Sequence, residues 1–466
     1  MSAYPTNRRH FLQTAGGGFG MLALRSLLAA DNRNPMNVLS PEFAPRAKSV
    51  IFLFMYGGPS QVDTFDPKPA LDRWNGKVIS TFRKEDAFNA ATKATAMRSP
   101  YTFAKHGQSG LDICEKFPHL ARHADKLCVI RSLHADSNNH GPALFQMNSG
   151  FVQSGHPSMG SWVTYGLGSE NENLPGYVVL TDRNGAPVNG AMNWSNGFMP
   201  ATYQGVPFQT AGSPILYLKR PEGVTVAQQR RRLDLIRKWN ERYSAANPAE
   251  SALAARVAAY ELAWRMQSHA PAAVDISRET KATRAQYGLD HKTTEFFGRN
   301  CLLARRLVER GVRFVQVYSG GNEGPTAWDA HGNLKENHDR QCAQTDQPIA
   351  ALLTDLKQRG LLDTTLVVWG GEFGRLPTHQ GSDGRDHNSF GFTMWLAGGG
   401  VRGGLAYGAT DEFGYAAVEN KVHVHDLHAT ILHLIGLNHE QLTYPHLGRN
   451  FRLTDVEGRV VKELIA

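Results

Sequence analysis

The feature that most constrains the fold is a set of short, unbroken apolar runs that end in glycines. Residues 49–55 read Ser-Val-Ile-Phe-Leu-Phe-Met ahead of Gly57-Gly58, and residues 366–369 read Leu-Val-Val-Trp ahead of Gly370-Gly371. Runs of this length without polar alternation are typical of parallel strands that are buried on both faces. Further strands are predicted at 127–131, 177–180, 311–318 and 392–397.

Segments with helical spacing of apolar residues separate these strands. From about 222 to 311, Ala, Arg, Leu and Glu dominate, which predicts three or four helices divided near Asn247-Pro248 and Ala270-Pro271. We expect these helices to pack on one face or edge of the sheet. Strands that alternate with helices favour a mainly parallel sheet covered on both faces, and therefore an α/β fold. Other helices are predicted near 115–124, 142–149, 340–359 and 426–436.

The N-terminus carries a predicted export signal. Arg8-Arg9-His10-Phe11-Leu12 precedes a mildly apolar, glycine-rich stretch that ends near Ala30. Paired arginines ahead of Phe-Leu and a weak apolar region are typical of a twin-arginine signal peptide; the alternative is a disordered basic tail. We therefore expect residues 1–30 to be a signal, residues 31–466 to form one α/β domain with a helical insertion at about 222–311, and the protein to reach the periplasm or cell envelope. No later run is long enough for a transmembrane anchor.

Charge and cysteine content exclude some classes of function. The formal charge is +8, and without the three arginines of residues 1–30 it is near +5. The positive charge is scattered and no basic patch is interleaved with aromatic residues, so we expect no nucleic-acid partner. The four cysteines show no metal-type spacing, and they are interpreted as buried thiols, with one disulfide as the alternative.

Two loops bring candidate metal ligands. Asp329 and His331 lie two residues apart after a predicted strand, and alternate side chains of an extended loop point the same way. The alternative is a turn in which Asp329 binds backbone amides and His331 lies at the surface. Glu372 follows Gly370-Gly371 at a strand end, and His387 comes soon after it. Ligands bind at the carboxyl ends of strands in open α/β sheets, and divalent cations need several convergent O and N atoms.

Other polar clusters have structural alternatives. For Glu372, the alternative to a ligand or acid/base role is a structural acid or an ion pair to Arg375. His140 belongs to a polar loop ahead of a predicted helix start, where free N–H groups favour an anionic substrate or a nucleophile; the alternative is helix capping by Ser137, Asn138 or Asn139. The histidines at 423, 425, 428 and 433 surround a helix with an apolar inner face, and we interpret them as structural.

The order of these loops resembles the alkaline phosphatase–sulfatase superfamily, and within it the exported DUF1501 proteins, a sulfatase-like branch. The resemblance spans nearly the whole chain. It implies a three-layer α/β sandwich with a metal site at the carboxyl ends of the strands. The matching segments are the twin-arginine signal, FMYGGPSQVDTFDPKP, WDAHGN, TLVVWGGEFGR, GRDHNSFGFTMWLAGGGVRGG, YGATDE and VHDLHATILHLIGL.

The resemblance also implies roles for single residues. Asp329 and His331 stand where the phosphatase branch binds one metal, and Glu372-Phe373-Gly374 stands where the superfamily has Asp-His-Gly or Asp-Asn-Gly. His387 would replace a later histidine or lysine. Two departures are clear: Gly57-Gly58 occupies the place of acidic ligands, with Gln61 or Asp63 as substitutes, and the sulfatase nucleophile motif is absent, with His140 at its position.

Two hypotheses follow. The first is an exported metal-dependent hydrolase or transferase acting on phosphate or sulfate esters of a small molecule or polysaccharide. Asp329, His331, Glu372 and His387 would hold a divalent ion (zinc, calcium or manganese). His140 or a metal-bound water would attack, and Arg375 would clamp the anion. The second is a non-catalytic envelope binding or assembly protein that retains the fold.

Overall fold

A central sheet organises the described part of the chain. The computed structural model describes residues 36–209, 220–246, 251–322 and 324–466, and the predicted signal at 1–30 lies outside them. Within the described ranges the main sheet has nine strands. Their order is β14 (Leu405–Tyr407), β5 (Leu127–His134), β13 (Phe392–Ala397), β9 (Thr365–Gly370), β1 (Ser49–Met55), β8 (Phe314–Ser319), β6 (Tyr177–Leu180) and β7 (Val206–Phe208), with β17 (Val422–His423) also paired to β5.

The sheet is mainly parallel. Strand β1 pairs in parallel with both β8 and β9, and Phe52 lies between Gln316 and Val368 in this register. Among the strands of this sheet, β13 alone runs in the opposite direction, because it is antiparallel to both β5 and β9. The carboxyl ends of β1, β5, β8 and β9 therefore lie at one edge of the sheet.

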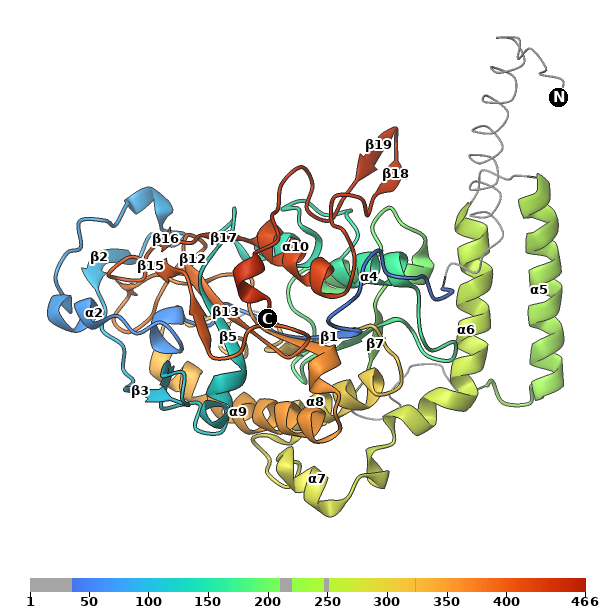
Figure 1. Ribbon diagram of the computed structural model, residues 1–466, viewed down its shortest axis with the longest axis horizontal. Helices are drawn as coiled ribbons and strands as arrows, with labels where there is room; N and C mark the ends of the chain where they lie inside the picture. The colour runs from blue at the N-terminus through green and yellow to red at the C-terminus, as the bar shows by residue number, and fades with distance from the viewer. Residues whose placement is uncertain (1–35, 210–219, 247–250, 323) are drawn as a thin grey trace, which may run out of the picture.

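Helices cover both faces and make a three-layer sandwich, as predicted from the sequence. Ile51, Leu53 and Met55 pack with α6 (Ser251–Val274), α8 (Glu295–Val308) and α9 (Leu334–Gln358) in one core. Val50, Phe52 and Phe54 pack with α3 (His140–Ser149), α4 (Met159–Leu167) and α10 (Val424–Leu434) in the other. Alternate residues of β1 thus pack into two different cores on opposite faces of the sheet. In Figure 1, α8 and α9 lie below the sheet and α4 and α10 above it.

The helices differ from the prediction in three places. Helix α5 (Val226–Ala246) packs on α6 rather than on the sheet. Helix α6 continues through Pro271 to Val274, because the buried side chains of Ala270 and Ala273 hold its last turn against the core. The helix predicted near 115–124 is a 3-10 segment at Leu120–Lys126, since Pro118 disfavours a helix before it. Helix α7 (Lys281–Gln286) is short.

The remaining elements are small. All four cysteines are buried and unpaired, which confirms their interpretation as free thiols. No helix in the described ranges combines the length and apolarity needed to cross a membrane. The small elements are α2 (Pro69–Trp74), β2 (Thr92–Ala96), β3 (Phe103–His106), β4 (Leu111–Cys114), β10 (Gly374–Arg375), β11 (Thr378–Gln380), β12 (His387–Asn388), β15 (Ala409–Thr410), β16 (Ala417–Glu419), β18 (Tyr444–His446) and β19 (Arg449–Phe451).

Candidate metal centre

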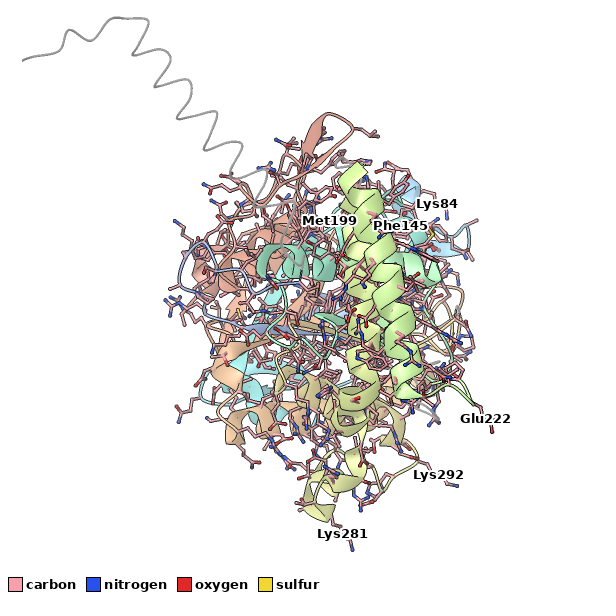
Figure 2. All side chains as sticks on the ribbon, turned by 90° about the vertical axis from the view of Figure 1, so that its right-hand side faces the viewer. Lys84, Phe145, Met199, Glu222, Lys281 and Lys292 are labelled. Atoms are coloured by element: carbon pink, nitrogen blue, oxygen red, sulfur yellow. The ribbon has the colours of Figure 1, made fainter. Side chains whose placement is uncertain are left out.

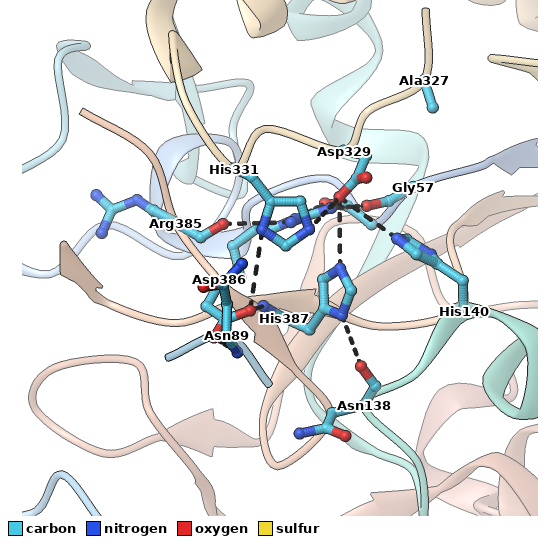
Figure 3. Close-up of polar contacts among 12 residues, drawn as sticks. Gly57, Asn89, Asn138, His140, Ala327, Asp329, His331, Arg385, Asp386 and His387 are labelled. Atoms are coloured by element: carbon cyan, nitrogen blue, oxygen red, sulfur yellow. Dashed lines mark hydrogen bonds and ion pairs between the residues drawn. The ribbon is translucent and has the colours of Figure 1, made fainter. Parts of the chain in front are cut away.

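Three histidines surround one carboxylate oxygen at the carboxyl edge of the sheet. Oδ1 of Asp329 lies 3.0 Å from Nε2 of His331 and 3.4 Å from Nε2 of both His140 and His387. The four ligand atoms all lie within 4.8 Å of one another. Figure 3 shows the three imidazoles turned toward Asp329. The structure thus brings together three of the four predicted ligands and adds His140, which the sequence suggested as a nucleophile.

Each contributing loop follows a different parallel strand. His140 is the first residue of α3, after β5, and Asn139 caps that helix by accepting a hydrogen bond from the N–H of Gly141. Asp329 and His331 follow β8, and His387 lies in β12 after β9. The parallel arrangement of β5, β8 and β9 therefore explains why side chains almost 250 residues apart in the sequence meet (from His140 to His387).

The outward nitrogen of each histidine faces an oxygen. Nδ1 of His140 lies 2.6 Å from Oε1 of Glu372, and Nδ1 of His387 lies 2.7 Å from the carbonyl oxygen of Asn138. Nδ1 of His331 lies 2.6 Å from Oε1 of Gln380. These oxygens accept hydrogen bonds, so each Nδ1 carries a proton, and in the neutral form of each ring the Nε2 lone pair is directed at Asp329.

This arrangement fits a divalent ion. Four electron-pair donors that face one another repel unless a cation lies between them, and the buried Nε2 of His140 has no hydrogen-bond partner among the described residues. Metal–nitrogen distances of about 2.0–2.1 Å place the ligand atoms of a tetrahedral ion about 3.3 Å apart. The distances of 3.0–3.4 Å from Asp329 agree with that spacing. Histidines whose second nitrogen donates to an oxygen are also usual at metal sites.

Protonation states in the cluster suit a metal ligand set. Burial alone would raise the pKa of Asp329, but Arg375 and the three histidines outweigh burial and hold this pKa far below its usual range. Burial and the nearby Arg375 lower the pKa of His387 well below its usual value, although Asp329 opposes them. Burial would also lower the pKa of His140, but the nearby carboxylates of Asp329 and Glu372 outweigh burial and raise it to about 9. The carboxylate is therefore ionised, and His387 is neutral.

Glu372 lies behind the cluster rather than in it. Its fully buried carboxylate accepts one hydrogen bond from Nδ1 of His140 and one from the backbone N–H of Gly57. Its carboxylate is therefore turned toward His140 and the backbone, whereas the sequence suggested a place beside Asp329. The cause is the turn at Gly57, where φ is +109° and where an added Cβ would lie 2.6 Å from the backbone nitrogen of Asp329. The close approach of these loops leaves Glu372 facing the N–H of Gly57.

Arg375 is fully buried and its donors all have acceptors. Its Nη2 donates to Oδ1 of Asp329 at 2.6 Å and to the carbonyl oxygen of Gly57. Nε donates to the carbonyl oxygen of Gly58, and Nη1 to that of Arg385. The guanidinium thus joins the loops after β1, β8 and β9. The function suggested by the sequence, an anion clamp, stays a prediction.

Asp63 and Gln61, suggested from the sequence as substitutes for acidic ligands after β1, make other contacts. Asp63 accepts two hydrogen bonds from the guanidinium of Arg385, at 2.7 and 3.2 Å, and one from Ser60. The side chain of Gln61 binds the backbone of Arg375 and Gly414. Among the described residues, neither belongs to the group that surrounds Asp329.

A second group of potential ligands, His423, His425 and Glu457, lacks a free lone pair at His423. Nδ1 of His423 accepts the backbone N–H of His425 as the cap of α10, and Nε2 faces a carboxylate oxygen of Asp136 at 3.3 Å. His428 lies in the same helix and its Nε2 binds the carbonyl oxygen of Met147. These contacts are structural, in line with the interpretation from the sequence.

Two contributors to the site were missed at the level of sequence. Gln380 fixes His331 from β11, and no pattern around it indicates this contact. The carbonyl of Asn138 fixes His387, and a backbone atom leaves no signature in a sequence. Asp386 accepts hydrogen bonds from Asn89 and Thr92 and supports the loop beside His387. The position of His140 directly after a strand end was the one available signal for a further ligand.

Residues 47–465 match the family model described as "Protein of unknown function (DUF1501)". The chain matches no curated protein.

Solved structures with a similar arrangement share little sequence with this chain. The lipoteichoic acid synthase LtaP from Listeria monocytogenes is 8% identical, with 89% of this chain and 78% of that chain covered and a TM-score of 0.37. The PsFucS1 sulfatase from Pseudoalteromonas sp. is 11% identical, with 89% and 70% covered and a TM-score of 0.36. A protein in the alkaline phosphatase superfamily from Vibrio parahaemolyticus is 11% identical, with 86% and 70% covered and a TM-score of 0.32.

Proposed function

The chain belongs to the DUF1501 family, and from the cluster around Asp329 we propose that it is a metal-dependent hydrolase or transferase acting on phosphate or sulfate esters. One observation carries the proposal: three histidines with fixed Nδ1 protons direct their Nε2 atoms at one carboxylate oxygen. The resemblance of the loops to sulfatase-like proteins supplies the substrate class.

The ligands in this proposal are His140, Asp329, His331 and His387. Three imidazole nitrogens and one carboxylate oxygen favour zinc over calcium, because calcium takes oxygen ligands. Manganese is intermediate, since carboxylate suits it better than imidazole does. His140 therefore acts as a ligand in place of a nucleophile, and Glu372 positions it. A divalent ion held here would supply the Lewis acid that neutralises charge developing on an ester during its displacement.

The charge of the site favours an anionic substrate. When the histidines are neutral and bind the ion, the positive charge of Arg375 offsets the negative charge of Asp329. A divalent ion then gives the site a net positive charge, even with the buried carboxylate of Glu372 beside it. The side chain of His331 is 31% exposed while that of Asp329 is 11% exposed. An ester would therefore approach from the side of His331. Phe88, which stacks on His387 and is half exposed, forms one wall of that approach.

A non-catalytic envelope protein is the second candidate. It is favoured by the buried cysteines, because burial raises the pKa of Cys114 and Cys128 to about 12 and leaves no reactive thiolate. It is also favoured by Gly57-Gly58, which provide no acidic side chain after β1.

An ester assay on the metal-loaded full chain tests the proposal. We expect release of p-nitrophenol from a phosphate monoester, a phosphate diester or a sulfate ester, abolished by a chelator and restored by zinc or manganese. His331→Ala should lower turnover at least about 100-fold. His379→Ala is the matched control, because this histidine of β11 binds the carbonyl of Ser382 and is not part of the cluster. Metal binding without any turnover would support the non-catalytic candidate.

Export is part of the proposal. The support is the sequence Arg8-Arg9-His10-Phe11-Leu12 ahead of a weak apolar stretch. We expect the protein in the periplasm or cell envelope, delivered by the twin-arginine machinery. Replacing both arginines with lysine should retain it in the cytoplasm, and equal distribution of the variant and the wild-type protein between fractions would contradict this.

A further inference from the structure

Helix α5 stands outside both cores. It packs on α6, and none of the described side chains from Val226 to Tyr243 is buried. Its half-buried residues include Leu233 and Ile236, and Arg230 pairs with Glu261 of α6. Figures 1 and 2 show α5 at one side of the molecule, with its outer face open to solvent. This outer face is about 30 Å long at 1.5 Å per residue.

A row of large apolar side chains runs along this outer face. Leu235, Trp239 and Tyr243 are spaced by four residues, so they lie one above another on the helix. Their exposed fractions are 47%, 60% and 54%. Exposing large apolar side chains such as Leu235 and Trp239 on one face of a helix is unfavourable, and such a patch is typical of a surface to which a partner binds.

Cations lie beside the apolar row. Arg231 and Arg232 lie four and three residues before Leu235, and Lys238 and Arg242 lie three residues after Leu235 and Trp239, so all four neighbour the row. All four are exposed, and none forms an ion pair with any other described residue. Arg230 and Arg237, by contrast, pair with Asp234, Glu241 and Glu261 on α5 and α6.

We propose that the outer face of α5, formed by Arg231, Arg232, Leu235, Lys238, Trp239, Arg242 and Tyr243, docks on an anionic phospholipid surface. A helix that presents apolar side chains beside cations lies flat at a bilayer interface: leucine and aromatic rings enter the acyl boundary and cations bind the headgroups. A second copy of this face is disfavoured, because it would bring four unpaired cations against four others. A purely electrostatic partner leaves the apolar row in water.

The docked orientation leaves the candidate metal centre accessible. Strand β12, which carries His387, and α5 lie toward opposite sides of the molecule in Figure 1. A bilayer under α5 therefore does not cover the cluster. Docking through α5 requires neither metal binding nor ester hydrolysis.

Vesicle co-sedimentation with the full chain tests the proposal. We expect binding to vesicles of phosphatidylcholine with 30% phosphatidylglycerol and at least about tenfold weaker binding to pure phosphatidylcholine, since an anionic surface attracts the cations beside the apolar row. Arg231→Glu with Lys238→Glu should weaken binding to the mixed vesicles at least about tenfold. Trp239→Ala with Leu235→Ala should also weaken it, and Trp239 fluorescence should shift to the blue on binding.

The matched control is Lys281→Glu with Lys292→Glu, which makes the same change in charge on exposed residues away from α5 (Figure 2). This variant should bind like the wild-type protein, and circular dichroism should show that all variants are folded. Equal loss in the control, equal binding to both vesicle types, or no binding overturns the proposal. A wild-type dimer that dissociates in the α5 variants overturns it too, and assigns the face to a second copy.

Discussion

Nδ1 of His140 lies 2.6 Å from Oε1 of Glu372, so a buried carboxylate stands directly behind a histidine whose other nitrogen faces Asp329. This pair explains two features at once. It sets the tautomer of His140. It also shows that Glu372, which the sequence places at a strand end, binds a histidine and not the metal. Carboxylates in this position orient the ring and increase the basicity of the ligating nitrogen.

Replacing Glu372 should weaken metal binding without abolishing it. Glu372→Gln retains an oxygen for His140 and Gly57 but loses the charge, and we expect about tenfold lower zinc affinity; Glu372→Ala loses both and should cost about 100-fold. Competition with a chromogenic chelator measures both affinities. An affinity unchanged in Glu372→Ala would contradict the role given to this residue.

Metal affinity should depend on pH through His140. Without metal, the carboxylates of Asp329 and Glu372 outweigh burial and raise the pKa of His140 to about 9, so below pH 9 an incoming ion displaces a proton. The affinity should therefore rise about tenfold per pH unit from pH 7 to 9 and then level off. Titrations at half-unit steps check this, and a flat profile from pH 7 to 9 would exclude His140 as a protonated ligand.

Arg375→Lys should destabilise the fold although it keeps the charge. Lysine cannot reach the carbonyls of Gly57, Gly58 and Arg385 as well as Asp329, so we expect the free energy of unfolding to fall by about 3 kcal/mol. Arg340→Lys, on the exposed side of α9, should change it by less than about 0.5 kcal/mol. Urea denaturation compares the two. A small loss of stability with a large rise in KM for an ester would instead favour the anion clamp.

Two glycines beside His331 give a matched test of loop packing. A Cβ on Gly384 would lie 1.9 Å from the carbonyl oxygen of His331, whereas a Cβ on Gly332 meets no heavy atom closer than 3.9 Å. Gly384→Ala must displace the His331 loop and should lower zinc affinity at least about tenfold. Gly332→Ala should bind zinc like the wild-type protein. Equal affinities in the two variants would show that the position of His331 does not matter to the site.

Much of the sheet was predictable from the sequence because its strands are buried on both faces. The bounds of β1 and β13 agree with the apolar runs at 49–55 and 392–397. Helix ends were less predictable, because tertiary packing of Ala270 and Ala273 carries α6 past Pro271. The place of α5 was not predictable either, since its amphipathic pattern does not say which neighbour covers it.

The site was predictable as a region but not as a ligand set. Loops after parallel strands share an edge, which brought Asp329, His331 and His387 together as expected. Whether Glu372 or His140 faces Asp329 depends on the turn at Gly57 and on where α3 begins. These are differences of a few ångströms in backbone path, and local residue pattern does not encode them.

Metal content tests the central claim most directly. The full chain, loaded with zinc and dialysed against a weak chelator, should retain about one ion per chain by mass spectrometry of the metal. His379→Ala should retain the same amount, while His331→Ala, which loses a half-exposed ligand and little packing, should retain less than about a fifth. No ion in the wild-type protein, or equal retention in the two variants, would contradict a metal centre at Asp329.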